Sequence, residues 1–271
     1  MELKKKHSLH ARRDTIPSYV VGRRAALELL RDEEGRNKIE KLYIAHGSQG
    51  AAVGEILHLV RTNKVPHGEI DRRKFQDLES REAGGVDSQG VMILLRAQDY
   101  AEIEDVLGEK RTKTTQPLFI ALDGIEDPHN MGAIIRTAEA AGADAVLMPQ
   151  RGAVLTPAVY KASAGAATHI PIIKYGNLAE TLARLQKEFA FTCYGLAGEG
   201  EKTIFEVSYA NPTCLVIGSE DKGLHQLTRK RCDGLLTIPL YGKTESLNAS
   251  VAAAIAIFEV VRNRGMEKVI S

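Results

Sequence analysis

The C-terminal half of the chain alternates between short apolar runs and amphipathic stretches, and this alternation limits the fold more than any other feature. The apolar runs predict buried strands at 118–122, 145–148, 170–173, 191–194, 214–217 and 235–240. The amphipathic stretches predict helices at 131–141, 156–163, 178–189 and 246–262. Strands that alternate with helices in this way indicate an α/β fold with a mostly parallel sheet and helices on both faces.

A second, smaller α/β domain is expected before this sheet, at residues 17–96. Its apolar periodicity predicts strands at 39–45, 65–70 and 91–95 and helices at 23–31, 53–60 and 72–78. The polar and charged stretch 97–116 marks the expected linker, which places the larger domain at 117–264. Residues 1–16 are basic and polar and are expected to form a flexible tail.

The composition excludes several classes of protein. Hydrophobic residues make up 44% of the chain and charged residues 26%, which is typical of a globular protein. No stretch approaches about 18 consecutive apolar residues, and no apolar run follows the basic N-terminus, so we expect a cytoplasmic protein with neither a membrane span nor a secretory signal. The net charge of +1 means that a nucleic-acid partner would need a local basic patch.

The three cysteines, Cys193, Cys214 and Cys232, are widely spaced and form no Cys-x-x-Cys motif. We therefore expect small buried side chains in a reducing compartment and no metal site. Two loops resemble nucleotide-binding loops. Gly242-Lys243-Thr244 lacks the preceding glycine of a phosphate-binding loop, and the glycines at 195, 198 and 200 have the dinucleotide spacing reversed. Neither loop predicts ATP or NAD binding.

Polar side chains gather where three of the predicted strands end. Asn130 and Arg136 follow the first strand, Gly218 and Glu220 follow the fifth, and Ser246 and Asn248 follow the last. Each group taken alone is explained as well by helix capping, with Asn130 or Asn248 as the cap and Arg136 in solvent. Because the carboxyl ends of parallel strands meet at one edge of a sheet, one composite site is the better interpretation.

The segments DPHNMGAIIRTAEAAG, LVIGSEDKGL and IPLYGKTESLNASVAAAIA resemble, in this order, the three signature motifs of the SpoU branch of the SPOUT RNA methyltransferases. The segment KASAGA at 161–166 resembles a further element of the family, and GRRAAL at 22–27 resembles the start of the substrate-binding domain in ribosomal-RNA members. The resemblance covers residues 17–264. Asp221 replaces a usual glycine and Ala249 a usual valine, and neither change removes a functional side chain.

The resemblance implies a trefoil knot near the C-terminus, a homodimer, and methyl transfer from S-adenosylmethionine to a ribose 2′-hydroxyl of RNA. It implies that the cofactor contacts Gly218, Ile238 and Leu247. It also implies a catalytic and RNA-positioning set made up of Asn130, Arg136, Glu220, Ser246 and Asn248. Within this set Arg136 is expected to stabilise the alkoxide or to bind the adjacent phosphate, since a guanidinium stays protonated, and Glu220 is expected to orient it.

The expected substrate is 23S ribosomal RNA, because transfer-RNA members of the family usually lack the N-terminal extension. A transfer-RNA 2′-O-methyltransferase and a non-catalytic RNA-binding protein of the same fold are the alternatives. Within the small domain, Arg72-Arg73-Lys74 and the loop 83–89 are the first candidates for contact with RNA, although a solvated surface is the default interpretation of both.

Overall fold

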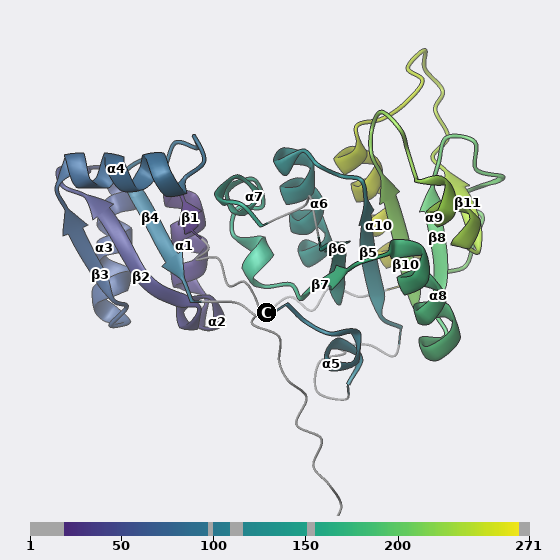
Figure 1. Ribbon diagram of the computed structural model, residues 1–271, viewed down its shortest axis with the longest axis horizontal. Coiled ribbons are helices and arrows are strands. Elements are labelled where there is room, and N and C mark those ends of the chain that lie inside the picture. Colours follow the sequence, from purple (N-terminus) through teal and green to yellow (C-terminus); the bar gives the residue numbers. More distant parts are fainter. Residues whose placement is uncertain (1–18, 97–99, 109–115, 151–154, 266–271) are drawn as a thin grey trace, which may run out of the picture.

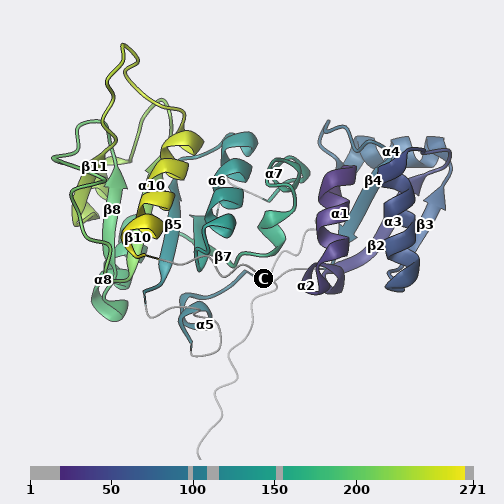
Figure 2. The same ribbon diagram turned by 180° about the vertical axis from the view of Figure 1, so that it is seen from behind.

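The computed structural model describes residues 19–96, 100–108, 116–150 and 155–265. The expected tail at 1–16 lies outside these residues. Two sheets organise the chain, one of four strands near the N-terminus and one of seven strands in the C-terminal half. Figures 1 and 2 show them side by side, with helix α7 between the two sheets in both views.

The N-terminal sheet has the strand order β1-β4-β2-β3. Its elements are β1 (Tyr19–Val21), α1 (Arg23–Arg31), α2 (Glu33–Asn37), β2 (Ile39–Ala45), α3 (Ala51–Thr62), β3 (His67–Ile70), α4 (Arg72–Glu82) and β4 (Val91–Leu95). Strand β4 is antiparallel to β1 and to β2, whereas β2 and β3 are parallel. The carboxyl ends of β1, β2 and β3 therefore share one edge with the start of β4.

The C-terminal sheet has the strand order β7-β6-β5-β10-β8-β11-β9, and every pairing in it is parallel. Its strands are β5 (Leu118–Asp123), β6 (Ala145–Pro149), β7 (Ile172–Tyr175), β8 (Thr192–Leu196), β9 (Lys202–Thr203), β10 (Thr213–Gly218) and β11 (Gly234–Thr237). The helices with it are α5 (Ile103–Leu107), α6 (Pro128–Ala140), α7 (Pro157–Ala162), η1 (Ala166–Thr168, a 3-10 turn), α8 (Leu178–Phe189), α9 (Gln226–Arg231) and α10 (Ala249–Asn263). The prediction of an α/β fold with a parallel sheet is confirmed.

Strand β5 shows why the central strands have continuously apolar sequences. All six of its residues are buried, because helices cover both faces of the sheet. Leu118, Ile120 and Leu122 pack in a cluster with residues of α6, α7 and α10. Phe119 and Ala121 pack on the opposite face, in a cluster with residues of α5 and α8.

The two domains share apolar packing. The cluster on the α6 and α10 face of the large sheet continues into the core of the N-terminal domain, which includes Ala26, Leu29 and Ile93. Polar contacts also cross the boundary. Lys38 Nζ donates to the carbonyl of Thr168, and burial lowers the pKa of this lysine. The N-terminal domain is thus held against α7 and η1.

Several expected boundaries were wrong. The strand expected to run to Leu240 ends at Thr237, since Pro239 has no N–H for a strand ladder. The strand expected at 170–173 begins after Pro171, at Ile172. The last helix begins at Ala249 and not at 246, because the side chain of Asn248 caps it there.

Part of the expected linker is also folded, since Ile103 and Val106 of α5 are buried against the large sheet. No helix among the described residues is long and apolar enough to cross a membrane. The trefoil knot stays a prediction, because strand order alone does not give the crossings of the chain.

Candidate active site

The loops that follow β5 and β10 meet at the carboxyl edge of the large sheet. The two strands are parallel neighbours, and their register places Gly218 opposite Asp123. After β5 the chain turns at Gly124 and enters α6, with Asp127 as its N-cap. After β10 it forms the loop 219–224, closed by a bridge between Ser219 and Gly223. This is the edge at which parallel α/β sheets bind ligands.

One carboxylate oxygen joins three of the predicted site residues. Glu220 Oε1 accepts a hydrogen bond of 3.0 Å from Asn130 Nδ2 and another from Asn248 Nδ2. Asn130 Oδ1 in turn accepts a hydrogen bond of 2.9 Å from Asn248 Nδ2. The backbone N–H of Ala249, at the start of α10, also donates to Glu220 Oε1, over 3.2 Å. We call Asn130, Glu220 and Asn248 the amide–carboxylate cluster.

The cluster is fixed by the start of α10. Asn248 Oδ1 accepts hydrogen bonds from the backbone N–H groups of Ser250 and Val251, over 2.9 and 3.3 Å. The same side-chain amide therefore caps the helix with its oxygen and binds Glu220 with its nitrogen. Asn130 is 9% exposed and lies in the first turn of α6. Three segments far apart in the sequence are held together by these contacts.

A cavity of about 310 Å³ opens next to this cluster. Apolar side chains form part of its wall, namely Leu196, Ile217, Leu224, Leu236, Ile238, Leu240 and Leu247. Polar and charged residues form the remainder, among them Glu199, Glu220, Arg229 and Glu245. All three residues expected to bind the cofactor, Gly218, Ile238 and Leu247, line this cavity. Its size is that of a small-molecule site.

Gly218 has a specific reason to be glycine. A Cβ atom at this position would lie 2.4 Å from the carbonyl carbon of Gly223 and 2.6 Å from the backbone nitrogen of Leu224. The loop 219–224 thus folds directly over the end of β10, and only a residue without a side chain leaves room for it. This close approach shapes the cavity wall.

A second contact anchors the same loop to β5. The buried carboxylate of Asp123 accepts hydrogen bonds from the backbone N–H of His225, over 2.8 Å, and from its ring Nδ1, over 2.7 Å. Tyr175 donates to the carbonyl of Leu122 beside it, and burial raises the pKa of this phenol. The segment that leads from the cavity into α9 is therefore tied to the end of β5.

Two of the expected catalytic residues lie outside the amide–carboxylate cluster. Ser246 lines the cavity and is exposed, but it does not belong to the amide–carboxylate cluster. Arg136 is exposed on α6 and lines a different cavity of about 570 Å³, shared with Glu28, Arg31 and His169. Among the described residues Arg136 makes no hydrogen bond or ion pair. Within one copy of the chain Glu220 binds Asn130 and Asn248, and its expected contact with Arg136 stays a prediction.

Part of the cavity was not predicted from the sequence. Leu196, Ala197, Gly198 and Glu199 line it, and they belong to the glycine-containing loop that was rejected as a dinucleotide site. Arg229 Nη1 forms an ion pair with Glu199 at this wall. Asp123 and His225 were missed as well. The polar residues after β8 were the available signal, but the position of β8 next to β10 was needed to interpret it.

The thiols and acidic groups offer no second centre in the part of the chain that is described. Cys193 and Cys214 are buried and Cys232 is partly buried, all three as free thiols. Burial raises the pKa of Cys232 to about 12 and keeps it protonated. No group of three or more His, Cys, Asp or Glu side chains among the described residues could hold a metal ion.

Comparison with known proteins supports one family. The model of the SpoU rRNA methylase family matches residues 117–258, and the model described as RNA 2′-O ribose methyltransferase substrate binding matches residues 19–101. A 23S rRNA (guanosine-2′-O-)-methyltransferase RlmB of Pseudomonas putida is 38% identical, over 85% of this chain and 91% of that protein. The putative TrmH family tRNA/rRNA methyltransferase YacO of Bacillus subtilis is 37% identical, over 91% of this chain and 96% of that protein.

Among solved structures, the SpoU methyltransferase AviRb from Streptomyces viridochromogenes, in complex with AdoMet, superimposes with a TM-score of 0.74. The match covers 92% of this chain and 91% of that one at 22% identity, and so supports the fold. The two family models together span both sheets of the chain. This chain belongs to the SpoU rRNA methylase family.

Proposed function

We propose that this protein transfers the methyl group of S-adenosylmethionine to a ribose 2′-hydroxyl of 23S ribosomal RNA. The observation that carries the proposal is the cavity at the carboxyl edge of the large sheet, which shares Glu220 with the amide–carboxylate cluster. The relatives named 23S rRNA methyltransferases and the N-terminal match to a substrate-binding model support ribosomal RNA as the substrate. That substrate implies a cytoplasmic location.

The cavity fits S-adenosylmethionine in size and in the chemistry of its lining. Ile217, Leu236 and Ile238 offer an apolar surface for an adenine ring, and the backbone around Gly218 can be approached closely because no side chain covers it. Glu245 adds negative charge near a ligand that carries a sulfonium and an ammonium group, whereas the charge of Glu199 is offset by its ion pair with Arg229. When bound, S-adenosylmethionine supplies an electrophilic methyl group.

The residues of the chain have to orient the ribose hydroxyl and stabilise the oxygen that forms as its proton leaves. Alignment of two reactants supplies much of the rate in a displacement of this kind. Asn130 and Asn248 are held rigidly through Glu220, and Ser246 lies at the cavity with a hydroxyl that can donate or accept. We assign these four side chains to positioning of the RNA at the cavity.

Arg136 is the cation that we propose for the phosphate or the developing alkoxide, and its position requires a second subunit. In one copy of the chain it lines a cavity between the domains and not the cofactor cavity. Helix α10, which packs against α6, exposes an apolar stripe of Val251, Ile255 and Phe258, which are 47%, 36% and 49% exposed. We propose a homodimer that buries this stripe and brings Arg136 of one copy to the cavity of the other.

Mixing two inactive variants tests this arrangement. Arg136→Ala and Glu220→Ala would each be inactive alone. If Arg136 acts across the dimer, a mixed dimer keeps one complete site, and about a quarter of the wild-type activity returns after subunit exchange. If Arg136 acts within its own copy, both sites of the mixed dimer stay defective and the mixture stays inactive.

The substrate is tested by mapping 2′-O-methylation in cells with and without the gene. Primer extension at low nucleotide concentration, followed by mass spectrometry of the fragment, should show one ribose methylation of 23S ribosomal RNA that disappears with the gene. A loss confined to transfer RNA would favour the alternative substrate. Calorimetry with S-adenosylmethionine tests the non-catalytic alternative, since an RNA-binding protein without activity would show no heat of binding at millimolar ligand.

A further inference from the structure

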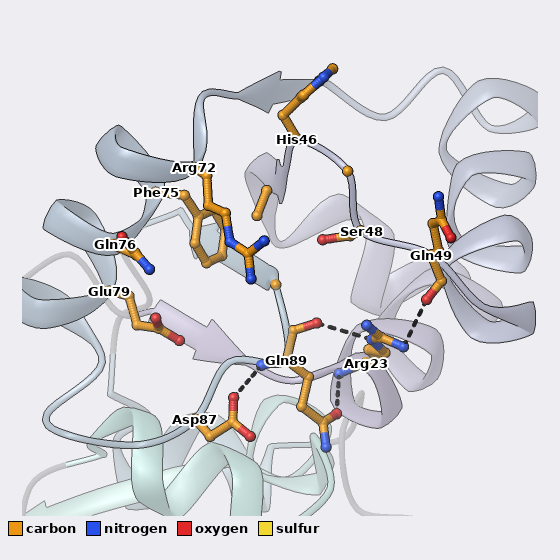
Figure 3. A pocket seen from close by; sticks show the side chains of 13 residues that line it. Arg23, His46, Ser48, Gln49, Arg72, Phe75, Gln76, Glu79, Asp87 and Gln89 are labelled. Carbon is orange, nitrogen blue, oxygen red and sulfur yellow. Dashed lines mark hydrogen bonds between the residues drawn. The ribbon is translucent and has the colours of Figure 1, made fainter.

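A second cavity, of about 380 Å³, lies in the N-terminal domain at the edge shared by the carboxyl ends of β1, β2 and β3. We call it the N-terminal pocket. Four segments line it, and Figure 3 shows their side chains: Arg23 after β1, residues 46–49 after β2, residues 72–79 of α4 after β3, and residues 87–90 before β4. Its volume lies in the range of small-molecule sites, which is about 300–1,000 Å³.

The walls of the pocket are held by hydrogen bonds between these segments. Arg23 Nε donates to the carbonyl of Gln89 over 2.9 Å, and Arg23 Nη1 donates to the carbonyl of Gln49 over 3.1 Å. Gln89 has a left-handed backbone with φ of 54°, and its N–H donates to Asp87 Oδ1 over 2.8 Å. A residue other than glycine held in this conformation indicates a constrained loop, which is typical of binding sites.

One acceptor in the pocket has a fixed orientation. Glu79 Oε1 accepts hydrogen bonds from the backbone N–H of Ser88, over 2.9 Å, and from the Ser88 hydroxyl. Ser88 is fully buried, so Oε1 of Glu79 is occupied by hydrogen bonds within the protein. The other carboxylate oxygen, Oε2, makes no hydrogen bond among the described residues, and Glu79 lines the pocket. The pocket therefore presents a preorganised carboxylate acceptor.

A free guanidinium stands opposite this carboxylate. In Figure 3 the side chain of Arg72 extends into the pocket above the buried ring of Phe75. Arg72 makes no hydrogen bond or ion pair among the described residues. A planar guanidinium stacks on nucleobases and binds phosphate, and single-stranded RNA is recognised by such stacking together with hydrogen bonds to base edges. The mixed charge of the pocket favours a nucleobase over a bare phosphate.

We propose that the N-terminal pocket binds one unstacked nucleotide of the RNA substrate, with Arg72 on the face or phosphate of the nucleotide and Glu79 accepting from an amino group of its base. Adenine, cytosine and guanine carry such an amino group. Uracil does not, and its only N–H lies between two carbonyl oxygens that a carboxylate repels. This proposal rests on the proposed function and names a base class that the pocket selects.

The pocket is also connected to the active site. Lys161 Nζ, at the end of α7, donates to the carbonyl of Asp87 in the pocket wall over 2.7 Å. Helix α7 packs tightly on α6, since a Cβ atom at Gly132 would lie 2.5 Å from Ala162 Cβ and 2.8 Å from the backbone nitrogen of Ser163. Helix α6 carries Asn130. A nucleotide bound in the pocket is thus held at a defined distance from the ribose that is methylated.

Binding of labelled single-stranded oligonucleotides to the full chain tests the proposal. Fluorescence anisotropy should show that 12-mers of adenosine and of cytidine bind about tenfold more tightly than a 12-mer of uridine. A tenfold difference is the effect expected of one hydrogen bond to a charged group. In Glu79→Gln the amide oxygen keeps both Ser88 bonds, and an NH₂ group then faces the pocket in place of the acceptor. This variant should lose the preference for adenosine and cytidine and bind the uridine oligomer more tightly than the wild type does.

Two further variants distinguish a specific contact of Arg72 with the nucleotide from a general effect of positive charge. Arg72→Ala should weaken binding of all three oligomers about tenfold. Arg61→Ala makes the same charge change at an exposed residue of α3 outside the pocket, and it should weaken them less than twofold. An unchanged base preference in Glu79→Gln, or equal effects of Arg72→Ala and Arg61→Ala, would overturn the proposal. Failure of the proposed function would appear separately, as a wild-type protein that shows the base preference but methylates no RNA.

Discussion

Replacement of Gly218 by alanine tests whether the loop 219–224 shapes the cofactor cavity. The new Cβ atom would meet backbone atoms of Gly223 and Leu224 at 2.4 to 2.7 Å, where ordinary contacts begin at 3.4 Å. No flexible side chain can move aside, because all three nearest atoms belong to the backbone. The loop must therefore withdraw from the end of β10 by about 1 Å at the closest contact.

The loss of stability can be calculated from the contacts that this displacement breaks. Ser219 and Gly223 exchange two backbone hydrogen bonds, of 3.2 and 2.9 Å, and a shift of this size stretches them beyond useful length. Overpacking costs about 1–3 kcal/mol, and each lost hydrogen bond about 0.5–1.5 kcal/mol. We expect a loss of about 2–6 kcal/mol in the free energy of unfolding. At about 2–4 °C per kcal/mol in a domain of this size, that lowers the Tm by at least about 4 °C.

The affinity for S-adenosylmethionine should fall at least about tenfold, since restoring the native loop on binding takes at least about 1.4 kcal/mol. Isothermal titration calorimetry and thermal unfolding measure the two effects. Gly54→Ala is the control, because a Cβ atom there meets nothing within 4 Å and Gly54 lies inside helix α3. It should leave the affinity unchanged and raise the Tm slightly. A Gly218→Ala variant that binds within twofold of the wild type with an unchanged Tm would refute the reasoning.

Three further changes probe other parts of the molecule. Arg136→Ala should abolish methylation but leave the calorimetric affinity for S-adenosylmethionine within about threefold, because its proposed partner is the phosphate or developing alkoxide of the RNA and not the methyl donor; full turnover would remove it from the mechanism. Burial raises the pKa of the Cys232 thiol to about 12. This thiol should therefore react with a disulfide reagent at pH 8 at least about a hundredfold more slowly in the folded protein than in denaturant. Equal rates in the two states would contradict its burial. Asn248→Asp keeps a capping oxygen for α10 but places a second carboxylate beside Glu220 Oε1. Repulsion between the two carboxylates raises the pKa of the pair in the folded variant above its value in the unfolded chain. The variant should therefore lose stability as the pH rises through that pKa and regain it in acid. Thermal unfolding should show a larger decrease in Tm, relative to the wild type, at pH 8 than at pH 5.

The sequence predicted that polar residues gather at one edge of the large sheet, because two local rules combine there. Apolar runs without polar interruption, such as Leu118–Leu122, indicate strands buried on both faces, and parallel strands end at one edge. Polar residues that follow β5, β10 and β11 were therefore expected together, and Asn130, Glu220 and Asn248 do lie together. The capping explanation would have been sufficient for each segment alone, and only the shared edge favoured a common site.

The partners of individual side chains could not be predicted in the same way. Arg136 was expected near Asn130, yet six residues along a helix amount to a rotation of about 240° and a rise of about 9 Å, so the two side chains leave α6 in different directions. The wall at Leu196–Glu199 depends on sheet order, because β10 enters between β5 and β8 although β8 comes first in the chain. Periodicity identifies strands and does not order them. The contact of Asp123 with His225 depends on the same order.

Asn248 shows why helix capping and site assembly are not competing explanations in this protein. Its Oδ1 atom must face the N–H groups of Ser250 and Val251, and this requirement turns its Nδ2 atom towards Asn130 and Glu220. An isolated cap would need only the oxygen, and aspartate or serine would serve as well. Asparagine alone among the common caps offers an acceptor to the helix and two N–H donors, which here reach the carboxylate of Glu220 and the amide oxygen of Asn130. An asparagine at this position is therefore explained by the amide–carboxylate cluster as well as by the helix, and the start of α10 determines the geometry of that cluster.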